Sequence, residues 1–419
     1  MLKRIIVTVL VLFIASAAMA QEGTTSPYSF YGIGTLKFKG TAENRMMGGI
    51  GVLSDSIHLN LQNPAGVAEL RLVNFTVGAS HKETRLKTDS DSQNAATTSL
   101  DYIAVGIPMG KFGASFGLIP YTSVGYQLQT ESQTDEGLQS ITRYTGTGGI
   151  NKAFLNVAYQ ITPKLSFGVD ANYNFGNIEN KALSAREDVE FSTREINKSD
   201  ILGFSFNFGA TYKTMVSDEL ELATSLTYTP ETDFTSENTR SLATVVFLGD
   251  GGESTVDSRD IPVSDTDFSF PSQLTAGAGI GKPKNWFVGA EYTSQKTSNF
   301  TNRTFTLENV EFKDASKYKL GGFYIPNYNG YGSYWKRVVY RAGMRFEETG
   351  INVNGEDINE FGISFGVGLP VGRVFSNVNL GFEIGTRGTK DFGLVKENFF
   401  NTFLSLSLND KWFEKRYFE

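Results

Sequence analysis

From about residue 71 to the C-terminus, apolar residues alternate with small or polar ones along segments of about ten residues. A period of two is typical of a β-strand whose two faces meet different surroundings. Segments of this length match a tilted strand that crosses a bilayer better than a common strand of a soluble sandwich. The alternation is clearest over residues 165–176, 202–212, 363–369 and 378–385. It predicts a protein built largely from long strands.

We count fourteen such strands, joined by connections that alternate between short and long. An even strand number, with short turns at one rim and long loops at the other, is typical of an outer-membrane barrel. We therefore predict an all-β fold, a 14-stranded antiparallel transmembrane β-barrel with both chain ends at the short-turn rim. Strand centres are expected near residues 77, 104, 120, 154, 170, 207, 225, 275, 290, 320, 342, 364, 381 and 404. Long connections are expected at residues 84–97, 130–149, 178–199, 230–266, 298–315, 348–357 and 388–397, with residues 326–336 unusually long for the short-turn rim.

The composition of the chain excludes several classes of function and structure. The chain has 419 residues, a net charge of −7 and no cysteine. The lack of a basic stripe argues against nucleic acid as a partner, and the lack of cysteine excludes disulfides and thiolate metal sites. Beyond residue 20, no apolar stretch is long enough for a transmembrane helix.

The first twenty residues predict a signal peptide. Lys3 and Arg4 precede an apolar stretch over Ile5–Ile14, and Ala18-Met19-Ala20 forms a cleavage signal. A short N-terminal membrane anchor is the alternative. Residue 21 is not cysteine, so a lipoprotein is excluded. We divide the chain into a signal peptide (1–20), an N-terminal arm and hatch (21–70) and a barrel (71–419).

Residues 41–70 predict a small plug, or hatch. Asn63 can cap a helix whose first position is Pro64, followed by Ala65 and Gly66. The segment is too small to be stable alone, so we expect it to sit inside the barrel. Preceding it, Tyr28, Phe30 and Tyr31 either pack in the lumen or form a peripheral arm.

The glycine-rich lead at 46–52, Asn-Pro-Ala-Gly at 63–66 and the strands that follow resemble the FadL family of outer-membrane hydrophobic-compound channels, which includes TodX. The ending Asn409–Phe413 is similar to that of Bacteroidetes-type members. The resemblance implies a bacterial outer-membrane protein in contact with lipid that takes up hydrophobic small molecules, such as long-chain fatty acids, without a cofactor. Some FadL-like barrels instead serve as subunits of protein-export or barrel-assembly complexes, which is the alternative. A general porin is a weaker interpretation, because a plug argues against an open channel.

The third predicted strand carries Gly117 and Pro120. Proline cannot donate a ladder hydrogen bond and a closed barrel has no edge strand, so a bulge or kink is expected there. In the resembling family, the third strand kinks inward and opens a lateral hole. The resemblance therefore implies a lateral gate at Gly117 and Pro120; a simple proline bulge without an opening is the alternative.

A second candidate site is an apolar run in the fourth long connection. The resemblance implies ligand capture by external loops, and the run would supply Leu242, Val245, Val246, Phe247 and Leu248. An extension of strand seven or a hairpin packing on its neighbours is the alternative. The acidic residues that follow, from Asp250 to Asp267, lack EF-hand spacing, so we expect a solvated loop and no metal site.

The sequence lacks the combinations of residues that common catalytic sites require. The chain has only two histidines, His58 and His81, and nothing places either beside a serine and an acid on one wall. Residues 277–282 imitate a nucleotide-binding loop, but they lie within a strand and Pro283 follows. We expect no catalytic site.

Overall fold

The computed structural model describes residues 23–133, 137–247, 252–299, 309–328, 333–371 and 376–411. The predicted signal peptide, Leu248 and residues 412–419 lie outside these ranges. Among the described residues, no helix has the length and apolar character needed to cross a membrane.

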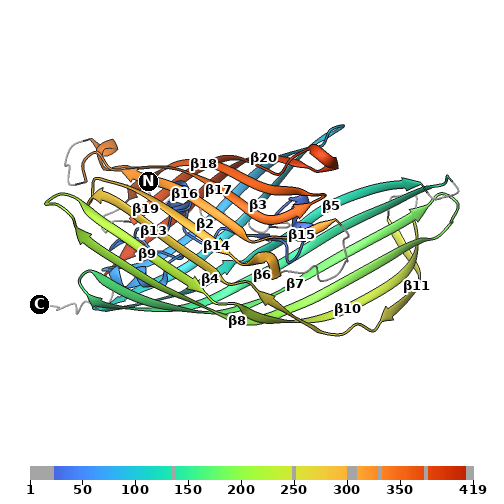
Figure 1. Ribbon diagram of the computed structural model, residues 1–419, viewed down its shortest axis with the longest axis horizontal. Helices are drawn as coiled ribbons and strands as arrows, with labels where there is room; N and C mark the ends of the chain where they lie inside the picture. The colour runs from blue at the N-terminus through green and yellow to red at the C-terminus, as the bar shows by residue number, and fades with distance from the viewer. Residues whose placement is uncertain are drawn as a thin grey trace, which may run out of the picture.

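Antiparallel strands form a closed barrel (Figure 1). Its circuit closes where β2 pairs with both β3 and β20. Three segments lie off the circuit (β1, β11 and β15) and three pairs each form one interrupted strand (β4 and β5, β9 and β10, β12 and β13), which leaves fourteen strand positions in the described chain. The predicted 14-stranded fold is confirmed, and each predicted strand centre falls within a strand. The strands are β1 (Thr35–Leu36), β2 (Val73–Lys87), β3 (Ser92–Met109), β4 (Phe112–Pro120), β5 (Thr122–Gln133), β6 (Gln139–Thr162), β7 (Leu165–Arg186), β8 (Ser192–Met215), β9 (Glu221–Thr229), β10 (Thr232–Phe247), β11 (Glu253–Ile261), β12 (Thr266–Phe270), β13 (Gln273–Lys282), β14 (Trp286–Gln295), β15 (Val310–Phe312), β16 (Ala315–Tyr324), β17 (Val339–Val353), β18 (Glu356–Val371), β19 (Ser376–Arg387) and β20 (Lys396–Asp410).

The two faces of the wall are the reverse of those of a soluble protein. Along β7, Phe167 and Val169 point outward and are 46% and 42% exposed, whereas Asp170 and Asn172 point inward and are buried. Apolar residues line the outside of the other strands in the same way, and polar residues line the inside. This arrangement is typical of a barrel whose outer surface meets lipid.

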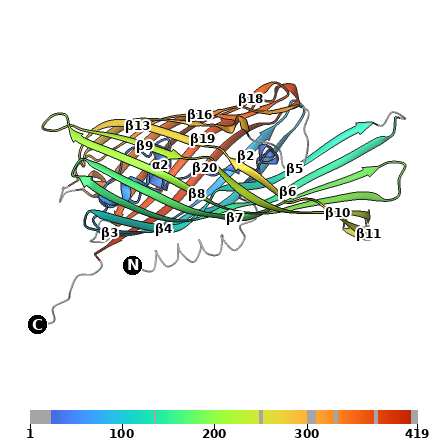
Figure 2. The same cartoon turned by 60° about the horizontal axis from the view of Figure 1, so that its bottom comes forward.

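Several connections expected as long loops are instead regular strand. The strands β7 and β8 extend to Arg186 and Ser192, so most of residues 178–199 is paired backbone, and β2 and β3 leave only residues 88–91 between them. In these extensions apolar residues are fewer and do not keep the period of two, which hides the strands in the sequence. The extensions of β5–β8, with β10 and β11, form a curved sheet that projects past the rest of the barrel (Figures 1 and 2). The long connection expected at 326–336 contains a short helix, η4 (Tyr334–Arg337), and residues 329–332 lie outside the described ranges.

The N-terminal segment lies against the inner face of the barrel. It contains η1 (Pro27–Phe30), α2 (Ala42–Met46) and η2 (Pro64–Glu69), of which α2 packs on β17–β20 and η2 on β3, β4 and β6–β8. Glycines in the wall permit this close approach: a Cβ on Gly168 would lie 2.4 Å from the carbonyl carbon of Pro64, and one on Gly321 would lie 2.0 Å from the Met47 oxygen.

The sequence-predicted cap is formed, although the helix it starts is a 3₁₀-helix. The Asn63 side chain accepts a hydrogen bond from the Ala65 N–H at 3.0 Å, and Pro64 occupies the first helical turn. The same Asn63 side chain donates to the Ala210 carbonyl on β8. Pro64, Ala65 and Gly66 are all buried. One asparagine therefore caps the helix and attaches it to the wall.

Candidate functional site: a break in the barrel wall

The third strand position is interrupted between Pro120 and Thr122. Below the interruption, β4 pairs with β3 on one side and with β6 on the other. Above it, β5 pairs with β6 and with the short strand β1, and among the described strands no pairing joins β5 to β3. Residues Ser92–Leu100 of β3 are paired with β2 alone. The wall therefore has a break between β3 and β5.

The local sequence explains the break. Pro120 is paired with Asn151, and Val124 with Gly148, so four steps on the third strand oppose three on β6. This extra residue is a β-bulge, which bends a strand and increases its twist. Gly148 and Gly149 allow it, because their φ angles of 109° and 149° suit glycine alone. Pro120 adds to the interruption, since it has no N–H to offer to a neighbour.

Gly117 lies just below the break, on the paired side. A Cβ there would lie 2.2 Å from the Ile103 carbonyl oxygen of β3. Gly117 thus allows β3 and β4 to approach closely near the end of their pairing, which stops at Ile103 and Leu118. The structure brings both predicted gate residues to the break, whereas their role in transport remains a prediction.

The break lies at the boundary between two kinds of outer surface. Pairing across neighbouring strands puts Pro120 level with Asn151 on β6, Phe175 on β7 and Leu202 on β8. On one side of this level, the outward residues are apolar, as at Leu202, which is 42% exposed. On the other side lie charged residues such as Lys198 and Glu179, which form an ion pair of 3.1 Å.

A cavity of about 280 Å³ lies behind the break. On one side it is lined by Thr97, Ser99 and Asp101, which lie on or beside the part of β3 that pairs with β2 alone. On the other side it is lined by Pro120 and Tyr121. The N-terminal arm, residues 23–39, and inward residues of β9, β13, β14 and β16–β18 line the remainder, so the cavity extends across the interior of the barrel. The cavity therefore borders both edges of the break.

The inner wall has two contrasting halves. Next to β5, β6, β7, β8 and β10 it is apolar, and the arm residue Ile33 packs there with Val124, Ile150 and Phe234, while Phe30 packs against the same cluster. Tyr28 packs elsewhere, with Val353, Ile358 and Leu394. The structure thus places the aromatic residues of the arm inside the barrel.

The opposite half of the inner wall is charged and binds the N-terminal segment. The buried Glu383 accepts from Arg345 of β17 at 2.7 Å and pairs with Arg45 of α2 at 3.3 Å. Glu291 pairs with Lys319 at 2.7 Å and accepts a hydrogen bond from the Gly51 N–H at 2.8 Å. Each carboxylate therefore links the barrel wall to the segment. Sequence reasoning missed these contacts, because charged residues on alternate strand positions look like any solvated face.

The apolar run predicted to capture ligand is not a loop. Leu242, Val245, Val246 and Phe247 belong to β10, which forms a hairpin with β11, as in the strand-extension alternative. Val245 is buried in a small cluster with Leu183 and Ala243, whereas Phe247 is 52% exposed. Of the acidic residues that follow, Glu253 pairs with Lys181 and Arg194. No group of acidic residues or histidines suited to a metal ion occurs in the described parts of the chain.

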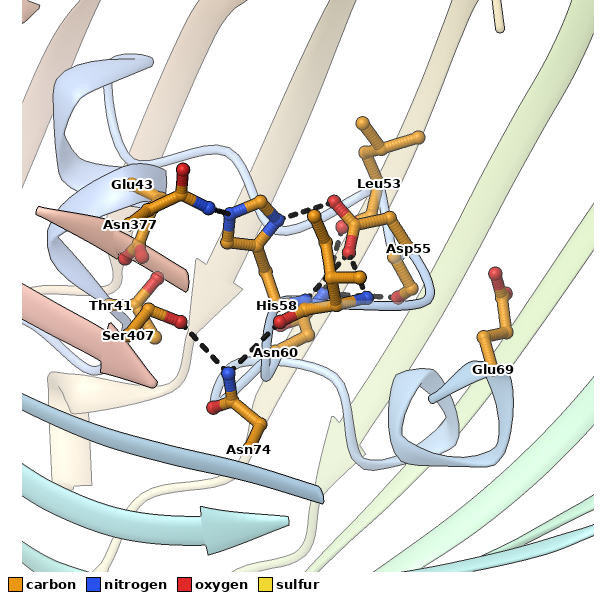
Figure 3. A network of polar contacts seen from close by, with 12 residues as sticks. Thr41, Glu43, Leu53, Asp55, His58, Asn60, Glu69, Asn74, Asn377 and Ser407 are labelled. Atoms are coloured by element: carbon orange, nitrogen blue, oxygen red, sulfur yellow. Dashed lines mark hydrogen bonds and ion pairs between the residues drawn. The ribbon is translucent and has the colours of Figure 1, made fainter. Parts of the chain in front are cut away.

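A polar network also holds the segment at the short-turn end of the barrel (Figure 3). The His58 ring contacts the Asp55 carboxylate through Nδ1 at 2.7 Å and the Asn377 side chain of β19 through Nε2 at 3.1 Å. Nearby, the Asn74 side chain of β2 donates to the Ile57 carbonyl and to Ser407 of β20. His58 had no assigned role from sequence.

Burial and charge act in opposite directions on this pair. Burial alone would raise the pKa of Asp55, but His58 and the N–H groups of Ile57 and His58 outweigh it and lower that pKa. Burial would lower the pKa of His58, but the Asp55 carboxylate, helped by Glu43 and opposed by Arg341, raises it. The charged pair is therefore favoured near neutral pH.

These features together define a FadL-type β-barrel: fourteen strands, an N-terminal segment inside them and a wall interrupted at the third strand. The chain belongs to the BamG family, whose model matches residues 1–419.

Among solved structures, the CymD monoaromatic hydrocarbon channel is similar, with 14% identity, a TM-score of 0.58, and coverage of 91% of this chain and 99% of that one. The Pseudomonas putida toluene transporter TodX has 17% identity and a TM-score of 0.57, with 90% and 99% covered. A Pseudomonas aeruginosa FadL homologue has 10% identity and a TM-score of 0.57, with 90% and 98% covered. At these identities the likeness shows the fold. No curated protein matches the chain.

The His58–Asp55 pair predicts pH-dependent attachment of the segment. The contribution of His58 is complete below its ordinary pKa, near 6.5, and is lost as pH rises through the raised value in the folded protein. The contribution of Asp55 is lost only in strong acid. Hydrogen exchange at residues 53–60, corrected for intrinsic rates, should therefore be slower at pH 6 than at pH 9. His58→Gln should abolish this difference, whereas the exposed His81→Gln should keep it; a difference that survives in H58Q would contradict the assignment.

The Glu383 bridge predicts a large loss of stability when it is broken. Glu383→Gln leaves Arg345 and Arg45 without their shared buried carboxylate, and breaking such a contact typically costs about 3 kcal/mol. Guanidinium unfolding in detergent would measure the loss. Glu219→Gln is the control, because Glu219 forms an exposed pair with Lys282 and should change stability by less than about 1 kcal/mol. Equal effects of the two substitutions would show that Glu383 does not hold the segment.

Proposed function

We propose that this protein is an outer-membrane barrel that admits hydrophobic small molecules, such as long-chain fatty acids, and passes them sideways through its wall between β3 and β5. The observation that carries the proposal is the cavity lined from both edges of the break. Apolar residues of β5–β8 and β10 adjoin it on the inside, so an apolar molecule that enters there finds a matching surface. Solved structures with this fold include a monoaromatic hydrocarbon channel and a toluene transporter, which supports a hydrophobic substrate for this protein as well.

The outer membrane is the location proposed for the protein. The outward apolar residues form a surface suited to lipid, and the inward polar residues are buried inside the barrel. The projecting sheet carries charged residues outward, as at Lys198 and Glu179, and would stand in water on the outer side. The β10–β11 hairpin belongs to this sheet, and its exposed Phe247 is the residue we assign to first contact with ligand.

Gly117 and Pro120 would form the lateral gate. Pro120→Val restores a backbone donor at the interruption and favours continuous pairing of the third strand. Uptake of a fluorescent long-chain fatty acid by cells should fall several-fold, while heat-modifiable migration on a gel shows a folded barrel. Pro108→Val, in β3 near a short turn, is the control and should leave uptake unchanged. Wild-type uptake by a correctly inserted P120V protein would remove the gate role.

A second function, as a non-transporting subunit of an outer-membrane protein-export or assembly complex, is favoured by two observations. Ion pairs such as Arg45–Glu383 and Lys213–Glu69 bind the N-terminal segment to the barrel wall and oppose its movement. The projecting sheet offers a large surface, with β11 paired on β10 alone at its side. Such a surface suits a protein partner.

Extraction from native membrane in mild detergent, followed by mass spectrometry, separates the two functions. A bound apolar small molecule without a protein partner would support the channel. A stoichiometric protein partner with an empty barrel would support the subunit role and refute uptake as the main activity.

A further inference from the structure

Three lysines line the cavity without a carboxylate at ion-pair distance among the described residues. Lys152 of β6 is 6% exposed, and its Nζ lies 3.9 Å from the centre of the Tyr121 ring. Lys82 of β2 lies 4.5 Å from the centre of the Phe399 ring. Lys37 of the N-terminal arm donates to the Gly23 carbonyl. None of these three contacts is made to a carboxylate.

The charge around the cavity is opposite to that of the whole chain. The protein carries a net charge of −7, yet nine basic and four acidic side chains line this cavity. Six of the nine basic side chains form ion pairs, and the remainder are Lys37, Lys82 and Lys152. A buried ammonium group without a carboxylate beside it is costly, and an anion placed among these three lysines would lower that cost.

The position of the cavity identifies the kind of anion. It borders both edges of the break, which lies where the outward surface changes from apolar to charged. At such a boundary a lipid places its polar headgroup, and its acyl chains lie on the apolar side. A headgroup could therefore enter the cavity while the chains remain outside, against Leu202 and its neighbours. The cavity volume of about 280 Å³ suits a headgroup and is too small for a two-chain lipid.

We propose that the cavity binds the phosphate-monoester headgroup of a membrane lipid, with Lys37, Lys82 and Lys152 as its cationic contacts and with the acyl chains leaving the barrel between β3 and β5. A phosphate monoester carries up to two charges and three acceptor oxygens, which suits several lysines better than the single charge of a carboxylate. The proposal rests on the lateral opening of the proposed function, but it requires no transport.

Native mass spectrometry of the purified full chain tests the proposal. Four probes separate the sources of negative charge: dioleoyl phosphatidic acid, dioleoyl phosphatidylcholine, oleate and inorganic phosphate. The wild-type protein should retain phosphatidic acid at least about tenfold better than phosphatidylcholine, which has the same chains and a compensated headgroup. Oleate that binds as tightly would overturn the choice of phosphate. Inorganic phosphate that displaces the lipid at equal concentration would reduce the site to a free-anion site and overturn the lipid assignment.

Substitution of the lysines locates the site. Lys152→Gln and Lys82→Gln should each weaken phosphatidic acid binding about tenfold, and Lys111→Gln, an exposed turn residue, should leave it unchanged. Lys152→Met, which keeps the length of the side chain, protects against a loss caused by misfolding, and heat-modifiable migration verifies each barrel. Undiminished binding in folded K152M and K82Q proteins would overturn the proposal. Because binding is read directly, lysine-dependent lipid binding without fatty-acid uptake would uphold this inference and refute the proposed transport.

Discussion

Backbone pairing around a closed circuit is the constraint on which this structure depends. In hydrocarbon, a strand edge without partners leaves N–H and C=O groups that no water can reach, so a barrel must close. Here β2 closes the circuit with β20 through fifteen paired positions. The third strand position is the place where the wall departs from this rule. The departure occurs at the level where the outer surface turns from apolar to charged, and there water can satisfy the edge of β3.

The second edge at the break is covered in part by the chain itself. β1 of the N-terminal arm pairs Thr35 with Ser123 and Leu36 with Thr122, and the Lys37 N–H donates to the Tyr121 carbonyl at 2.9 Å. The arm thus supplies partners at the position where β5 has left β3. It also fills the apolar inner surface with Ile33. The same short segment, residues 33–37, pairs with the edge of β5 and packs against the apolar inner wall. Movement of the arm would therefore expose both surfaces together.

Strand number and position were predictable because a wall with lipid outside and polar groups inside requires a period of two at every strand. The predicted centres at 170 and 207 fall within β7 and β8 for this reason. Strand length was not predictable: beyond Phe175 the buried apolar residues Ile178 and Leu183 stand among polar ones and are an odd number of positions apart, so the period of two is lost although pairing continues to Ser184. Pro120 predicted the position of the interruption, because proline has no N–H to donate to the hydrogen-bond ladder of a sheet. The partners of Arg345, Glu383 and Arg45 were not predictable, since they lie on three elements far apart in sequence and meet only after the barrel closes.

The two halves of the interior restrict what the barrel can do. In the charged half, the carboxylates of Glu291 and Glu383 bind the N-terminal segment. This half offers little surface to an apolar molecule. The apolar half adjoins the break and is occupied by the arm. A route along the barrel axis would have to separate buried ion pairs, whereas a route through the wall would have to displace the arm, with its apolar contacts around Ile33 and its short pairing with β5. Because removing one partner of a buried ion pair typically costs more than losing a few apolar contacts, this interior favours the sideways route that we propose.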